Sequence, residues 1–219
     1  MTRLLRLLLA TVALLSVGTV AHAGLSSGLP AGPIGTPVIS TRSYTDMSDV
    51  LIVGDSITVR SYKELAASLM GRLAVNAQSG RNTKLSIDSL LAQLDAGAKL
   101  PPRLVMATGA NDIFSPYAMN TQVPRLLAAV PATTKVYWVD ASVLRPAYRM
   151  QDAVNTARVN TYIRKYCVGN CSVISWAGFL AAKSSRRAMY IDSGGVHPTD
   201  AGEEAWGGLI ALSVKGSSL

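Results

Sequence analysis

The sequence predicts an α/β protein built on a parallel β-sheet. Short apolar runs, typical of strands that are buried on both faces, alternate along the chain with longer segments of helical periodicity. Repeated strand–helix–strand units of this kind favour a parallel sheet with helices on both faces. A chain of 219 residues, 49% of them hydrophobic, is long enough to bury a substantial core in a single domain.

The first 23 residues have the features of a signal peptide. Arg3 and Arg6 give a positive start, residues 7–20 form an apolar run too short to span a bilayer comfortably, and Ala21-His22-Ala23 fits a signal-peptidase site. We expect cleavage after Ala23, a secreted or extracytoplasmic protein, and no stable membrane anchor afterwards. The alternative is an uncleaved amino-terminal anchor.

The charge of the chain is moderately basic. Its 21 Lys and Arg exceed its 13 Asp and Glu, and cleavage would remove two of the basic residues and leave a net charge of +6. Because the basic residues are scattered, a solvated basic surface is the simplest interpretation. Association with an anionic cell envelope suits this charge better than binding to nucleic acid.

Two cysteines, Cys167 and Cys171, lie close together in the sequence. In an exported protein such a pair favours a disulfide, and its small ring would have a local, modestly stabilising role. A metal site would need further ligands, and none cluster nearby in the sequence.

The elements follow one another in a regular order. Residues 24–47, rich in Gly, Pro, Ser and Thr, are expected to be an extended lead-in, and 48–219 to be one domain. Strands are expected at 50–53, 73–77, 104–107, 135–141 and 172–175. Helices are expected at 57–71, 83–98, 121–130, 151–166 and 200–214, the last with Asp200 as its N-cap.

Polar turns that contain glycine follow several of these strands. Ligands of open parallel sheets bind beyond the carboxyl ends of the strands, so these turns are the place to look for a site. They are Gly54-Asp55-Ser56, Gln78-Ser79-Gly80-Arg81-Asn82, Gly109-Ala110-Asn111-Asp112 and the late stretch Asp192 to Thr199.

These turns hold the parts that acyl transfer requires. Ser56 is a candidate nucleophile, and its own N–H, the N–H of Gly80 and the amide of Asn111 are candidate donors to an oxyanion. His197 is the candidate base, because His22 would leave with the signal peptide and no other histidine remains.

The order and spacing of Gly54-Asp55-Ser56-Ile57, Gly80, Gly109-Ala110-Asn111-Asp112 and Val196-His197-Pro198 resemble the SGNH/GDSL hydrolase family over about residues 48–215. The resemblance implies a flavodoxin-like three-layer α/β/α sandwich with a five-stranded parallel sheet, and a serine esterase or acyltransferase. It implies Ser56 as nucleophile, Gly80 and Asn111 as oxyanion donors, and His197 as base. Residues 136–139 and 174–177 also resemble strands of small secreted members that act on cell-wall or carbohydrate O-acyl groups.

Structural interpretations of the same residues stay open at this point. Ser56 could only cap the first helix, and Gly80 or Asn111 could only serve a turn. Asp55 and Asp112 are expected to orient loops, and Arg81 is expected to be a surface charge.

The third member of a catalytic triad is not where the family has it. An aspartate usually stands three residues before the histidine, where this chain has Gly194. Asp192, five residues before, is the nearest acid, and we expect the flexible stretch after it to let its carboxylate reach His197. The alternative is a Ser56–His197 dyad.

Three functional hypotheses remain. The leading one is an exported esterase that hydrolyses O-acyl esters, on cell-wall, carbohydrate or lipid substrates, through an acyl-enzyme on Ser56. The others are an O-acyltransferase that uses a wall sugar or lipid as acceptor, and a non-catalytic glycan-binding module. Nothing in the sequence implies a metal, a nucleotide or another cofactor.

Overall fold

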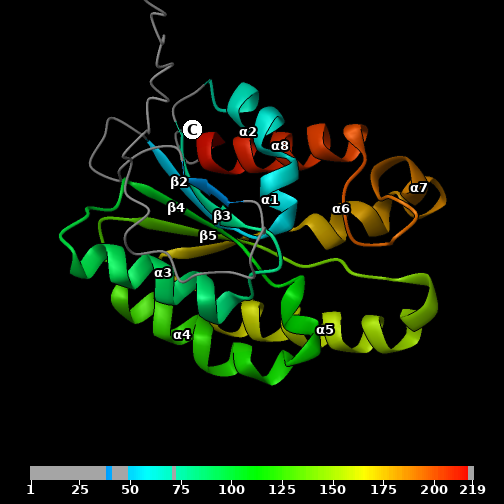
Figure 1. Cartoon of the computed structure of the whole chain (residues 1–219), viewed down its shortest axis with the longest axis horizontal. Helices are drawn as coiled ribbons and strands as arrows, with labels where there is room; N and C mark the ends of the chain where they lie inside the picture. The colour runs from blue at the N-terminus through cyan, green and yellow to red at the C-terminus, as the bar shows by residue number, and fades with distance from the viewer. Residues whose placement is uncertain (1–37, 41–48, 71–72, 217–219) are drawn as a thin grey trace, which may run out of the picture.

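A computed structural model describes residues 38–40, 49–70 and 73–216. They form one sheet with helices on both faces (Figure 1). The strands are β1 (Val38–Ser40), β2 (Val50–Gly54), β3 (Leu73–Gln78), β4 (Arg103–Ala107), β5 (Lys135–Val139) and β6 (Cys171–Ile174). The expected signal peptide and all of the lead-in except β1 lie outside the described residues.

The sheet has the strand order β1-β3-β2-β4-β5-β6, and β2 to β6 are all parallel. This confirms the five-stranded parallel sheet and the three-layer α/β/α fold. β1 is an addition, because it pairs antiparallel with β3 inside the segment that we expected to be an extended lead-in. Gly54 lies in register with Ala77 and Ala107, so β2, β3 and β4 reach the same edge of the sheet.

Helices cover the two faces in separate groups. α3, α4 and α5 pack side by side on one face, and α1, α2 and α8 lie on the other (Figure 1). The α-helices are α1 (Ser56–Arg60), α2 (Tyr62–Ser68), α3 (Thr83–Asp95), α4 (Met119–Ala129), α5 (Arg149–Tyr166), α6 (Trp176–Ala182), α7 (Arg187–Tyr190) and α8 (Asp200–Lys215). Four short 3₁₀ turns join them: η1 (Asn111–Phe114), η2 (Pro116–Ala118), η3 (Pro146–Tyr148) and η4 (Ser184–Arg186). None of the helices in the described ranges is long and apolar enough to cross a membrane.

Some expected boundaries are wrong. The single helix expected at 57–71 is broken at Ser61 into α1 and α2, after a run of β-branched residues that are stiff in a helix.

The N-cap of α8 is Thr199 instead of Asp200, because the Thr199 hydroxyl accepts a hydrogen bond from the N–H of Gly202 at 3.2 Å. The last strand ends at Ile174, and Ser175 caps α6, which the sequence pattern did not reveal.

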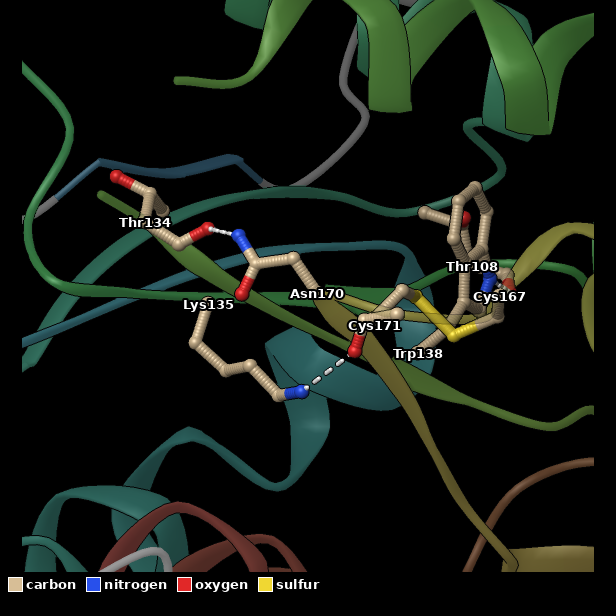
Figure 2. Close-up of a disulfide and its surroundings, with 8 residues drawn as sticks. Thr108, Thr134, Lys135, Trp138, Cys167, Asn170 and Cys171 are labelled. Carbon is tan, nitrogen blue, oxygen red and sulfur yellow. Dashed lines mark hydrogen bonds between the residues drawn. A yellow bond between two sulfur atoms is a disulfide. The ribbon is translucent and has the colours of Figure 1, made fainter. Parts of the chain in front are cut away.

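The expected disulfide joins Cys167 and Cys171 (Figure 2). It closes the short turn between α5 and β6, at the amino-terminal edge of the sheet. In the same turn, the side chain of Asn170 donates to the carbonyl of Thr134 at 2.8 Å and so ties the start of β6 to the start of β5. The disulfide therefore lies at the amino-terminal ends of the parallel strands, whereas Gly54 lies at their carboxyl-terminal ends.

The small disulfide ring predicts a small contribution to stability. For a loop of this size, chain-entropy arguments give about 2 kcal/mol at 25 °C. We expect the double variant Cys167→Ala/Cys171→Ala to fold, with a free energy of unfolding lower by no more than about 2 kcal/mol. Urea denaturation monitored by circular dichroism measures this. Failure of the double variant to fold would show that the ring does more than close a local turn.

Candidate active site

Ser56 lies at the point where β2 turns into α1. Asp55 is the N-cap of this helix, because its Oδ1 accepts a hydrogen bond from the N–H of Ile57 at 3.0 Å. Ser56 is the first helical residue, and its Oγ lies 2.9 Å from Nε2 of His197, which is 141 residues away in the chain. The capping role belongs to Asp55, so the structure does not support the interpretation of Ser56 as a helix cap.

His197 is held by a closed turn between α7 and α8. The N–H of Asp192 donates to the carbonyl of His197 at 2.9 Å, and the N–H of Gly195 donates to the carbonyl of Asp192 at 3.0 Å. Gly195 has a φ of +75°, and a Cβ at this position would lie 2.2 Å from the carbonyl oxygen of Leu144. A glycine is thus required for the turn to pack against the loop that follows β5.

Asp192 faces the other nitrogen of the imidazole at a longer distance. Its Oδ2 lies 3.9 Å from Nδ1 of His197, which is beyond hydrogen-bond length. The same oxygen lies 3.6 Å from a guanidinium nitrogen of Arg60. The carboxylate therefore lies on the Nδ1 side of the imidazole but about 1 Å too far for the hydrogen bond that we expected, so Asp192 does not reach His197 in this structure.

Arg60 is a site residue that the sequence analysis missed. It stands four residues after Ser56 in α1, and this spacing puts two residues on one helix face. The pKa of His197 lies below its usual value, first because the ring is partly buried, then because of the positive charge of Arg60, while Asp192 acts in the opposite direction. A lowered pKa keeps the imidazole neutral near pH 7 and able to accept a proton.

The two expected donor positions, Gly80 and Asn111, lie in neighbouring loops. The amide of Asn111 donates to the carbonyl of Arg81 at 3.2 Å, which places it beside the Arg81–Asn82 peptide, one residue beyond Gly80. Gly80 is exposed, has a φ of +76° and has no atom within 4 Å of where a Cβ would be. One of the two amide N–H groups of Asn111 is used in this contact, which leaves the other for a ligand.

Arg81 is not the surface charge that we expected. The residue is only 2% exposed. The guanidinium donates to the carbonyl of Gly54 at 3.0 Å and to Oδ1 of Asn76 at 2.9 Å. It therefore braces the end of β2, directly before Asp55 and Ser56, against β3.

Asp55 and Asp112 orient loops. Both carboxylate oxygens of Asp112 accept hydrogen bonds from Thr83 at the start of α3. The Thr83 hydroxyl donates to Oδ2 at 2.7 Å, and the Thr83 N–H donates to Oδ2 at 3.0 Å and to Oδ1 at 3.3 Å. Burial raises the pKa of Asp112, and burial raises the pKa of Asp55 to about 7. Among the described residues, no group of three or more His, Cys, Asp or Glu side chains is placed to hold a metal ion.

The family model described as "GDSL-like Lipase/Acylhydrolase family" matches residues 52–205. The chain belongs to this family. The match spans every segment of the site, from β2 to the start of α8, and lies inside the domain expected at 48–219. The chain is therefore an SGNH-type serine hydrolase, as the motifs predict, whereas the comparison with curated protein sequences gives no match.

Solved structures of several other proteins share the fold of this family member. The catalytic domain of peptidoglycan O-acetyltransferase A from Streptococcus pneumoniae superposes with a TM-score of 0.61 at 19% identity, over 78% of this chain and 93% of that one. A lipase/acylhydrolase from Enterococcus faecalis gives 0.62 at 16% identity, over 78% and 97%. A carbohydrate esterase of family 3 from Talaromyces cellulolyticus gives 0.53 at 17% identity, over 78% and 98%.

Removal of the Arg60 charge should shift the pH dependence of activity. In Arg60→Gln, the pKa of His197 should rise, because a nearby cation that disfavours the imidazolium is lost. The acid limb of kcat/KM for p-nitrophenyl acetate should then move to higher pH, so that the loss of activity relative to wild type grows as the pH falls through this limb. Arg125→Gln, which removes an exposed arginine from α4, is the matched control. An acid limb that stays in place or moves to lower pH would contradict this account.

Asp192→Asn tests whether the carboxylate orients His197. We expect kcat to fall by a factor on the order of 10²–10⁴ with little change in KM, because the acid fixes the tautomer and stabilises the imidazolium. Asp200→Asn, which changes an exposed acid three residues after His197, should keep nearly full activity. Nearly full activity in Asp192→Asn would instead indicate a Ser56–His197 dyad.

Proposed function

We propose that this serine hydrolase is an exported esterase that removes O-acyl groups from cell-wall or other carbohydrate substrates through an acyl-enzyme on Ser56. The observation that carries the proposal is the 2.9 Å contact between Ser56 Oγ and His197 Nε2. The Asn111 amide supports it, because it donates to the carbonyl of Arg81, the residue after Gly80. A hydroxyl bonded to a neutral imidazole is the arrangement that nucleophilic catalysis requires.

The reaction follows from these positions. Ser56 Oγ attacks the ester carbonyl carbon while His197 Nε2 takes the proton of the Ser56 hydroxyl. The oxyanion that forms accepts hydrogen bonds from the N–H groups of Ser56 and Gly80 and from the Asn111 amide. Collapse of the tetrahedral intermediate breaks the bond to the alcohol, which leaves with the proton from His197. Water then repeats the attack on the acyl-enzyme, releases the acid and restores Ser56.

Two observations support export and a carbohydrate substrate. The Cys167–Cys171 disulfide suits an oxidising compartment, in agreement with the predicted signal peptide. The structurally similar proteins include a peptidoglycan O-acetyltransferase and a carbohydrate esterase.

An O-acyltransferase is the second candidate. The similarity to an O-acetyltransferase domain favours it, because formation of the acyl-enzyme is common to both reactions and only the acceptor differs. Product analysis with an added sugar acceptor separates the two. The Ser56–His197 contact argues against a non-catalytic glycan-binding module.

Labelling of Ser56 tests the proposal directly. A fluorophosphonate should label Ser56 in the wild type, and Ser56→Ala should lose labelling and lose p-nitrophenyl ester turnover by a factor on the order of 10³–10⁶. Ser184→Ala, which removes an exposed hydroxyl from η4, should leave both unchanged. A panel of esters from acetyl to long acyl then defines the acyl group. Folded wild-type protein without labelling at Ser56 would refute the mechanism.

A further inference from the structure

We propose that Phe114, Arg145 and Tyr148 form an aromatic platform that binds a sugar ring on the alcohol side of the ester. The inference rests on the proposed function and names the part of the chain that would select the carbohydrate. The three side chains come from η1 and from the segment that leads into α5, which follow β4 and β5 at the carboxyl edge of the sheet.

Phe114 lies one 3₁₀ turn beyond the proposed oxyanion donor. Asn111 and Phe114 are the first and last residues of η1. In a 3₁₀ helix, side chains three residues apart lie on the same side, about 6 Å apart along the axis. This geometry puts Phe114 on the same side of the turn as Asn111.

Arg145 joins the two rings into one surface. Its Cζ lies 4.9 Å from the ring centre of Phe114 and 4.7 Å from that of Tyr148, within the range of cation–π contacts. Asp152 fixes the guanidinium, because Oδ2 accepts from Nε at 2.9 Å and Oδ1 accepts from Nη2 at 2.7 Å. Two of the five guanidinium N–H groups are used in this way, and the structure shows no acceptor for the other three among the described residues.

The platform is also tied to the rest of the site. The Asn155 side chain donates to the carbonyl of Ile113 at 2.9 Å and holds η1 against α5. The N–H of Leu144 donates to the carbonyl of Gly195 at 2.9 Å and holds the other loop against the His197 turn. The platform is thus connected to both the Asn111 side and the His197 side of the site, and a ligand would meet side chains that are already ordered.

The chemistry of the platform matches a sugar ring better than an acyl chain. Phe114 is 69% exposed and Tyr148 is 58% exposed, although Arg145 covers part of each ring. Aromatic faces carry partial negative charge and attract the C–H groups of a pyranose, while guanidinium N–H groups donate to its hydroxyls. An acyl chain would bring hydrocarbon against a charged group and remove water from it, which costs free energy.

The test compares substrates within each variant. For wild type and Phe114→Ala, kcat/KM is measured on acetylated xylohexaose, acetylated chitohexaose, p-nitrophenyl acetate and p-nitrophenyl octanoate. We expect the ratio of oligosaccharide to p-nitrophenyl acetate to fall about tenfold in Phe114→Ala for at least one oligosaccharide. Phe114→Tyr should restore the ratio. Leu212→Ala, an exposed position on α8, is the control and should leave all ratios unchanged.

Three results would overturn the proposal that this platform binds a sugar ring. They are no change in any ratio, an equal fall on all four substrates, or a fall on the octanoate as large as on the oligosaccharides, which would make this an acyl-chain surface. If the wild type cleaves no ester, the proposed function fails, and the platform is tested by binding alone. Unacetylated xylohexaose or chitohexaose should then bind Ser56→Ala about tenfold more tightly than Ser56→Ala/Phe114→Ala in titration calorimetry.

Discussion

The site depends on one buried cation. The guanidinium of Arg81 holds the carbonyl of Gly54 at the end of β2, and the carbonyl of Arg81 itself accepts from the Asn111 amide. The strand that leads to Ser56, the Gly80 turn and the η1 turn therefore meet at a single residue. A hydrogen bond from a charged group is stronger than one between neutral groups, so the contact with Gly54, together with that from Asn111, holds the loops relative to one another.

Three buried aspartates connect the strands to the helices. Asp55 follows β2 and accepts a hydrogen bond from the N–H of Ile57 in α1. Asp112 follows β4 and accepts one from the N–H of Thr83 in α3. Asp140 follows β5 and accepts one from the N–H of Ala177 in α6 at 2.6 Å. Burial raises the pKa of each carboxyl. Each carboxylate satisfies an N–H group that a helix start leaves without an intrahelical partner. These hydrogen bonds anchor the loops that follow the strands to the starts of the helices.

The sequence was sufficient for the fold and for the positions of Ser56 and His197, because apolar strands and the turns that follow them are encoded locally. It was not sufficient for Arg81, since an arginine in a polar turn carries no local sign of the carbonyl that it will meet.

The cap of α8 was misassigned for a similar reason: Thr199 and Asp200 are both good caps, and only the backbone geometry separates them. The distance from Asp192 to His197 depends on how the glycine turn folds, which the spacing of five residues does not specify. Arg60 could have been found, because its spacing from Ser56 is that of one helical turn.

The outermost strands of the sheet have a consequence for the behaviour of the protein in solution. β1 has three residues and β6 has four, so each end of the sheet offers few backbone groups to a neighbouring chain. Long, flat outer strands act as templates for intermolecular pairing, and short ones resist it. β1 runs antiparallel to β3 and pairs with only part of this longer, fully buried strand. Within the described residues, this arrangement leaves few backbone groups at either end of the sheet for a further strand to pair with.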